Sequence, residues 1–278
     1  HAVSSDKPRG RIDNVHWHQA NLLDCGMVMD LILSVRPTHL LHFAWYTVPG
    51  RYWNSVENFR WIEFSYFLLK QFVRQGGRRV LMAGTCAEYD RRYAFCLEGT
   101  TPLAPETLYG QSKYHLQRLL GIISERTGLS SAWGRIFFLY GPHENRSRFV
   151  SSSIFSLIQG MPVKCSNGGF IRDYLHVIDV ASAFVAVLDS DVQGAINIAS
   201  GRPISLRDLL NTIGDKFGRY DLICSDTMNS AVSDPQILIA DTSRLKEEVH
   251  WGPHYNLDEG LDQTIQWWKT NEISAIYH

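Results

Sequence analysis

The chain lacks long apolar runs and has almost no net charge. No segment approaches the roughly 20 apolar residues that a membrane-spanning helix needs, and the formal net charge is -1. This balance gives no indication of a basic surface for nucleic acid or of attraction to an anionic membrane. We therefore expect no nucleic-acid partner and no membrane partner.

Cysteine is scarce and scattered, and the sequence shows no internal repeat, no low-complexity segment and no signal peptide. The cysteines number five and lack the spacing of a metal site: Cys25, Cys86, Cys96, Cys165 and Cys224. An odd, dispersed set is typical of free thiols in a reducing compartment. We expect a cytoplasmic protein that holds no metal.

The residues that are present suit a globular protein with a sizeable core. The 278 residues are 45% hydrophobic and 20% charged, which allows one large domain or two modest ones. The first half alternates predicted strands at 14–20, 39–45, 78–85 and 131–141 with predicted helices at 26–35, 54–75 and 107–128. Apolar strands separated by helices predict a doubly wound parallel sheet covered on both faces.

After Gly141 and Pro142 the elements become shorter. The pattern predicts a helix near 148–159, a strand near Val163, a strand that turns into a helix around Ile178, a helix capped by Ser205 and a final amphipathic helix. We interpret this part as a smaller lobe over the carboxyl edge of the sheet. Ligands bind at that edge in open α/β sheets.

Tyr109 and Lys113 lie four residues apart in a predicted helix, so they share one helix face. A free tyrosine has a pKa of about 10 and is a poor base at neutral pH. A neighbouring ammonium lowers that pKa, and the tyrosine can then exchange a proton with a hydroxyl or a carbonyl during hydride transfer. The spacing by itself is equally typical of an exposed helix face, and alone it favours that interpretation.

Thr85 changes this balance, because it ends a predicted buried strand at the ligand edge. Its hydroxyl can bind the substrate oxygen that the tyrosine protonates, or it can cap its own backbone. A strand-end threonine, a loop and a helix with Tyr-x-x-x-Lys form a more specific pattern than any one part.

Five stretches carry a resemblance to a known family: "GTCAEYD", "PLAPETLYGQSK", "RIFFLYGP", "IRDYLHVIDVA" and "INIASGRPISLRDL". Over nearly the whole chain the sequence resembles the extended short-chain dehydrogenases/reductases, the NAD(P)-dependent epimerase/dehydratase group that acts on nucleotide sugars. The resemblance implies a Rossmann-type cofactor domain at 1–142 and 174–197, with a substrate lobe at 143–173 and 198–278. It also implies a homodimer.

The same resemblance assigns roles to the three residues discussed above. It implies that Tyr109 is the acid/base, that Lys113 tunes it and holds the nicotinamide ribose, and that Thr85 binds the substrate oxygen. Arg172 matches an arginine that clamps the nucleotide diphosphate, although a salt bridge with Asp173 or with another acidic residue is the alternative.

The family begins with a strand and a Gly-x-x-Gly-x-x-Gly turn that is missing here, and "HAVSS" matches the second strand. We interpret this as truncation, or as residues left out of the sequence, rather than as evolution without the turn. Ser4 stands where NAD-selective members carry an acid. With Ser5, Lys7 and Arg9 it favours NADP, and Asp6 keeps NAD open.

Three more positions match cofactor contacts, so the implied cofactor is NAD or NADP. Asn21 and Leu22 fall where the family contacts the adenine, and Ala44 falls in the turn beside the cofactor. Simple close packing also explains Ala44.

On the substrate side the sequence departs from the family at two positions. Phe138 replaces an asparagine that contacts the sugar nucleotide, and Cys86 with Ala87 replaces the Asp-Glu pair of dehydratases. Glu88 is close, but its register directs it elsewhere. The aromatic segment 45–61 either lines the sugar pocket or packs the next helix.

These features predict NAD(P)-dependent oxidoreduction at a sugar carbon of a nucleotide-activated hexose, by a 4-epimerase or a 4-ketoreductase. The alternatives are a catalytically idle NAD(P)-binding regulatory protein and a sugar-nucleotide dehydratase. The same three residues serve epimerase and reductase, so the sequence does not choose between them.

Overall fold

The computed structural model describes residues 1–6, 12–165, 167–225 and 234–276. Its strands are β1 (Ala2–Ser4), β2 (Trp17–Gln19), β3 (His39–His42), β4 (Arg79–Thr85), β5 (Phe95–Cys96), β6 (Ser130–Ile136), β7 (Phe138–Tyr140), β8 (Val163–Cys165), β9 (Ile171–His176), β10 (Gly194–Ile198), β11 (Pro203–Ser205), β12 (Ile223–Ser225) and β13 (Ile237–Ala240).

The α-helices are α1 (Cys25–Val35), α2 (Glu57–Arg74), α3 (Leu108–Thr127), α4 (Phe149–Ile158), α5 (Val177–Asp189), α6 (Leu206–Phe217), α7 (Ser243–Glu247) and α8 (Leu257–Ile276). Short 3-10 helices are η1 (Tyr52–Asn54), η2 (Cys86–Glu88) and η3 (Tyr220–Leu222). None of the helices within the described ranges combines the length and apolar character that a membrane crossing requires.

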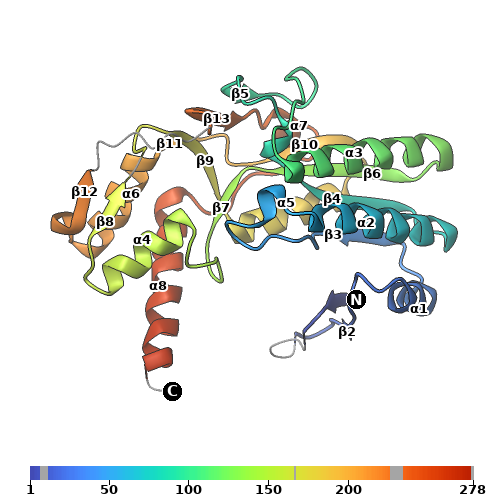
Figure 1. Cartoon of the computed structure of the whole chain (residues 1–278), viewed down its shortest axis with the longest axis horizontal. Coiled ribbons are helices and arrows are strands. Elements are labelled where there is room, and N and C mark those ends of the chain that lie inside the picture. Colours follow the sequence, from blue (N-terminus) through green and yellow to red (C-terminus); the bar gives the residue numbers. More distant parts are fainter. Residues whose placement is uncertain (7–11, 166, 226–233, 277–278) are drawn as a thin grey trace.

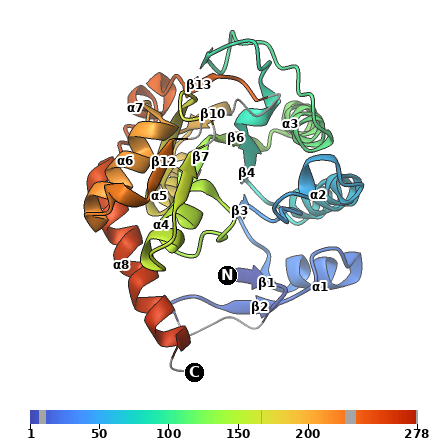
Figure 2. The same ribbon diagram turned by 60° about the vertical axis from the view of Figure 1, so that its left-hand side comes forward.

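A four-stranded parallel sheet, in the order β10-β6-β4-β3, forms the centre of the larger part. Successive side chains of β4 point to opposite faces. Val80 and Met82 pack against α2 and α3, whereas Leu81 and Ala83 pack against α5. Figure 2 shows these helices on the two sides of the sheet. The prediction of a parallel sheet covered on both faces is confirmed.

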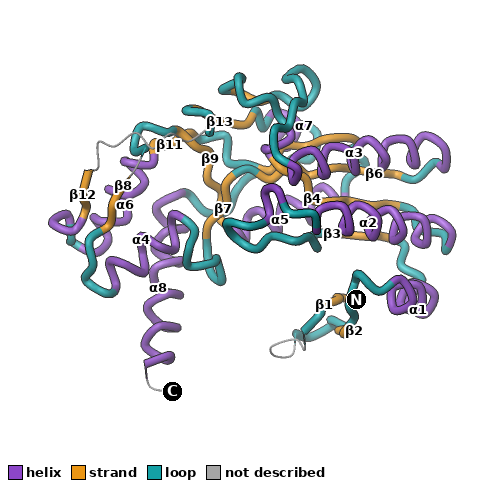
Figure 3. The backbone as a smooth tube through the Cα atoms, viewed as in Figure 1, coloured by secondary structure: helices purple, strands orange, loops and turns teal. Residues whose placement is uncertain are grey.

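Strands β1 and β2 form a separate two-stranded parallel sheet. Helix α1 follows them and packs on α2 through Val28 and Ile32, which meet Phe64 and Leu68. Figures 1 and 3 place this N-terminal unit beside β3, and no hydrogen-bonded ladder joins the two sheets in the described part of the chain.

The single strand predicted at 131–141 is two strands. β6 ends at Ile136 and pairs with β4 and β10, whereas β7 begins at Phe138 and pairs with β9. Between them, the N–H of Phe137 donates to the carbonyl of Ile198. The chain therefore passes from the central sheet into a second sheet of order β11-β9-β13-β5. The sequence of this stretch gave no sign of the break.

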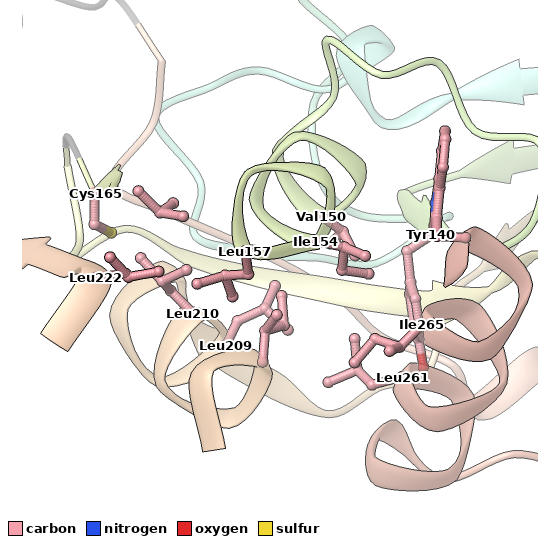
Figure 4. Packing of buried hydrophobic residues seen from close by; sticks show 13 residues of the cluster. Tyr140, Val150, Ile154, Leu157, Cys165, Leu209, Leu210, Leu222, Leu261 and Ile265 are labelled. Atoms are coloured by element: carbon pink, nitrogen blue, oxygen red, sulfur yellow. The ribbon is translucent and has the colours of Figure 1, made fainter. Parts of the chain in front are cut away.

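The smaller lobe has a hydrophobic core of its own. Figure 4 shows how side chains from α4, α6 and α8 meet in it, and its buried members include Val150, Ile154, Leu209, Leu261 and Ile265. The predicted boundary between residues 173 and 174 falls inside β9. The cap predicted at Ser205 is confirmed, because its hydroxyl accepts from the N–H of Asp208.

Candidate active site

Thr85 lies at the carboxyl end of β4, where the strand stops and η2 begins. Its hydroxyl oxygen accepts from the N–H of Ala87 at 3.2 Å, and its own N–H donates to a Glu88 carboxylate oxygen at 2.8 Å. The Thr85 side chain also lies close enough to Tyr109 to act on the pKa of its phenol. The structure shows the capping interpretation of Thr85, and its binding of a substrate oxygen stays a prediction.

Tyr109 comes to Thr85 because the first turn of α3 packs tightly on η2. Thr107 caps the helix by accepting from the N–H of Gly110. A side chain at Gly110 would lie 2.6 Å from the Ala87 carbonyl oxygen, well inside van der Waals contact. Only glycine allows this approach, and the tyrosine one residue earlier is thereby brought beside the end of β4.

Lys113 lies one turn further along α3 and points back toward the sheet. Its ammonium donates to the Ala83 carbonyl at 2.9 Å and lies 6.0 Å from the centroid of the Tyr109 ring. The side chain is buried. Burial lowers the pKa of Lys113 to about 7, and the Glu88 carboxylate opposes this shift.

The predicted lowering of the Tyr109 pKa is wrong for this structure. Burial and the neighbouring Tyr52 raise the pKa of Tyr109, and the Thr85 hydrogen bond only partly opposes them. The reason is that Lys113 directs its ammonium to the Ala83 carbonyl rather than to the phenol oxygen. The phenol is therefore protonated at neutral pH.

These three residues line one cleft of about 860 Å³ between the central sheet and the smaller lobe. Aromatic rings form much of its wall. The rings of Tyr52 and Trp53 stand edge-on to the Tyr109 ring, with centroid distances of 4.9 and 5.7 Å. Cys86, Phe138 and Arg172 line the same cleft. The structure thus brings together all the residues predicted for catalysis and for substrate binding.

Residues 1–199 match the family described as "NAD dependent epimerase/dehydratase family". The protein belongs to this family. The predictions of an NAD(P)-dependent enzyme with a Rossmann-type fold are confirmed.

Curated relatives are distant but extend over most of this chain. UDP-glucuronic acid decarboxylase 1 of Xenopus tropicalis is 24% identical over 94% of this chain and 64% of its own length, so the chain spans less than two thirds of that relative. UDP-glucose 4-epimerase of Rhizobium leguminosarum bv. trifolii is 22% identical over 93% of this chain and 86% of its own length.

Among solved structures, the UDP-glucose 4-epimerase of Thermotoga maritima with UDP-glucose superposes with a TM-score of 0.82 at 21% identity. The match covers 95% of this chain and 88% of that chain. Identity at this level shows the shared fold.

Arg172 lies in the cleft and contacts two aromatic rings. Its guanidinium carbon is 5.3 Å from the centroid of the Phe138 ring and 4.9 Å from that of the Phe170 ring. It donates to the main-chain carbonyls of Ile171 and Gln236. The alternative of a salt bridge with the adjacent Asp173 fails, because that carboxylate accepts from the backbone and hydroxyl of Ser200 and from Gly201. Burial lowers the pKa of Arg172.

The two departures from the family pattern can now be placed. Burial raises the pKa of Cys86 to about 12, which leaves a neutral thiol in the cleft. Glu88 points away from the cleft, as predicted, and its carboxylate pairs with Arg135 at 2.7 Å and accepts from Trp133. This buried ion pair supports the end of β4 rather than the chemistry.

The residues predicted at the adenosine end of the cofactor lie away from the cleft. Ser4 ends β1 and Asn21 lies two residues after β2. Each accepts from a nearby backbone N–H, and Ser5 and Leu22 lie beside them. Ala44 lies between Phe43 and Trp45, which line the cleft, but does not line it itself. Lys7 and Arg9 lie outside the described residues.

Sequence reasoning missed two charged groups that line the cleft, Glu144 and Arg148. The aromatic segment 45–61 divides between the cleft wall and helix packing, and its role at a sugar stays a prediction. Trp45, Tyr52 and Trp53 line the cleft, whereas Trp61, a residue of α2, packs in the core.

Proposed function

We propose that the protein catalyses NAD(P)-dependent oxidoreduction at a sugar carbon of a nucleotide-activated hexose, as a 4-epimerase or a 4-ketoreductase. The observation that carries this proposal is the convergence of Thr85, Tyr109 and Lys113 on one cleft. A regulatory protein that only binds NAD(P) needs no such set of acid/base residues. Relatives named as UDP-sugar enzymes support the substrate class.

The residues of the cleft fit a nicotinamide cofactor, because a buried lysine ammonium faces a large open volume and donates to only one main-chain carbonyl. Lys113 would hold the nicotinamide ribose, and the bound cofactor would accept or supply the hydride. Ser4, Ser5, Asn21, Leu22 and Ala44 remain our proposed contacts for the rest of the cofactor.

Tyr109 would carry the proton in either direction. Its protonated phenol suits donation to a keto oxygen, which is the step that a 4-ketoreductase and the second half of a 4-epimerase share. Removing a proton from a hydroxyl requires the phenolate, and the Lys113 ammonium would stabilise it only by turning from the Ala83 carbonyl toward the phenol oxygen. Thr85 would hold the same oxygen through its hydroxyl.

The substrate would lie across the cleft toward the smaller lobe. Arg172 presents a buried guanidinium at its wall, and Arg148 lines the same space. A guanidinium is well suited to bidentate binding of a diphosphate. Phe138 and Cys86 would flank the sugar nucleotide.

Dehydration is not favoured by this site. Elimination of water needs an additional acid/base pair, and the positions after Thr85 hold a neutral thiol and an alanine. Glu88 is committed to Arg135.

We further propose a homodimer in the cytoplasm. Helices α2 and α3 pack side by side and expose Phe59, Tyr66 and Ile122. All five cysteines are free thiols, which supports a reducing compartment.

A panel of nucleotide sugars tests the proposal. Full-length protein is incubated with nucleoside-diphosphate hexoses and their 4-keto derivatives, with NAD⁺ or NADPH. Absorbance of the reduced nicotinamide follows the redox step, and NMR identifies the products. We expect C4 inversion without net cofactor turnover, or reduction of a 4-keto sugar with consumption of NADPH. Loss of water from the hexose as the main reaction would refute it.

A further inference from the structure

Trp45 lies against the ammonium of Lys113. It follows β3 in the turn that faces the cleft, it is 8% exposed, and the Lys113 nitrogen lies 3.8 Å from the centroid of its ring. This distance is well within the roughly 6 Å over which an aromatic face attracts a cation.

The orientation of the Trp45 ring is fixed by a buried amide. Its indole N–H donates to the Asn58 side-chain oxygen at 2.8 Å, and Asn58 is fully buried. The amide nitrogen of Asn58 donates in turn to the carbonyls of Tyr52 and Ser55, at 2.7 and 2.8 Å. A buried amide with all these bonds satisfied holds a single conformation.

The same amide binds two aromatic residues of the site. It holds the indole of Trp45, which faces Lys113, through the indole N–H. It binds Tyr52, whose ring stands edge-on to Tyr109, through the main-chain carbonyl.

The ammonium needs such support because few other groups offset its burial. Within the described ranges no carboxylate forms an ion pair with it, and Glu88 on η2 acts only at longer range. His42 on β3 is held neutral, since burial and Lys113 lower its pKa to about 3. Tyr109 on α3 is a neutral phenol.

We propose that Trp45, held by Asn58, is a positioning residue that stabilises the charged form of the Lys113 ammonium and holds it at the wall of the cleft. The negative face of the indole partly replaces the water that Lys113 loses on burial. With one N–H bound to the Ala83 carbonyl and another facing the ring, the remaining N–H is left for a ligand in the cleft. The role depends on Lys113 acting as stated under the proposed function.

Two substitutions of Trp45 separate the effect of its aromatic face from the effect of its size. Trp45→Leu keeps an apolar side chain but removes the aromatic face, and Trp45→Phe keeps a face but loses the bond to Asn58. Trp61→Leu is the matched control, because Trp61 packs 6.2 Å from Trp45 in the same core and no contact joins it to Lys113.

The Lys113 pKa can be measured without substrate or cofactor. NMR titration of the full chain labelled at the lysine Cε gives it, with the Lys113 signal assigned by its loss in Lys113→Arg. We expect Trp45→Leu to lower this pKa by about 1.5 pH units, the equivalent of a desolvated cation–π contact. Trp45→Phe should lower it less, and Trp61→Leu should leave it unchanged.

The pH profile of kcat/KM on a confirmed substrate provides a second measurement. The apparent pKa in this profile that belongs to Lys113 should fall in the same variants as the NMR value, and by amounts in the same order. An unchanged Lys113 pKa in folded Trp45→Leu, or an equal shift in Trp61→Leu, would overturn the inference. Because the titration needs no turnover, its failure is distinguishable from failure of the proposed function.

Discussion

At the residue scale, each of the three side chains that we propose for the reaction is held by a different contact. Thr85 is fixed by the capping bonds of η2, Lys113 by a main-chain carbonyl and an aromatic face, and Tyr109 by edge contacts with two rings. Fixed side chains lose little freedom when a ligand binds, so their placement can contribute directly to rate.

Tyr109→Phe tests the proton carrier. The change removes the phenol oxygen and keeps the ring that packs against Tyr52 and Trp53. We expect turnover to fall by at least about 10²-fold, while the melting temperature and cofactor affinity stay near wild-type values. Steady-state kinetics and a cofactor-binding titration check this. Wild-type turnover by Tyr109→Phe on a confirmed substrate would show that the mechanism is wrong.

Lys113→Ala and Thr85→Val should separate the two supporting roles. Losing the ammonium should reduce turnover and weaken cofactor binding, because Lys113 is proposed to contact the ribose. Thr85→Val should reduce turnover with less effect on the cofactor, and should cost about 1 kcal/mol of stability because its hydroxyl caps η2. Equal cofactor affinities in both variants would contradict this assignment.

At the element scale, the decisive contact is the docking of α3 on η2. Gly110 lies where a Cβ would meet the Ala87 carbonyl and Pro105. The spacing of Tyr109 and Lys113 follows from the helix, but their distance from Thr85 follows from this close approach.

Gly110→Ala should therefore separate Tyr109 from Thr85. We expect turnover to fall by about 10-fold or more and stability to fall by about 1 to 3 kcal/mol, as for overpacking of a tight contact. Gly121→Ala is the control in the same helix, because nothing lies within 4 Å of an added Cβ there. It should stabilise the protein by about 0.5 to 1 kcal/mol with unchanged kinetics. Equal kinetics in both variants would argue against the docking role.

At the scale of the whole molecule, the cleft depends on two lobes with separate cores. Its catalytic wall comes from the central sheet and α3, and Phe138 and Arg172 come from the second sheet. Side chains that are far apart in the sequence therefore face one another across a single space.

The proposed dimer belongs to this scale. Leu116 and Leu120 on α3 face the protein's own sheet, so the exposed Phe59, Tyr66 and Ile122 are the better candidates for a subunit contact. We expect the full-length protein to sediment as a dimer at micromolar concentration. Phe59→Glu should shift it toward monomer, and Ile178→Glu, at an exposed position on α5, should not. A strict monomer would refute the dimer.

The sequence by itself determined the parallel sheet and the helices that cover it, and with the family resemblance it led to Thr85, Tyr109 and Lys113 as the proposed reacting residues. It could do so because apolar strands, helix periodicity and the Tyr-x-x-x-Lys spacing are local patterns. Gly128 ends α3 with φ 73°, as its place in the sequence predicted.

The tertiary structure alone decided the rest. The break at Phe137 depends on which strand pairs with β6 and which with β7, and the raised pKa of Tyr109 depends on burial that no local pattern records. Trp45 reaches Lys113 only because β3, α2 and α3 pack together. Contacts between segments far apart in the chain set burial and distance, and these determine the electrostatics of the site.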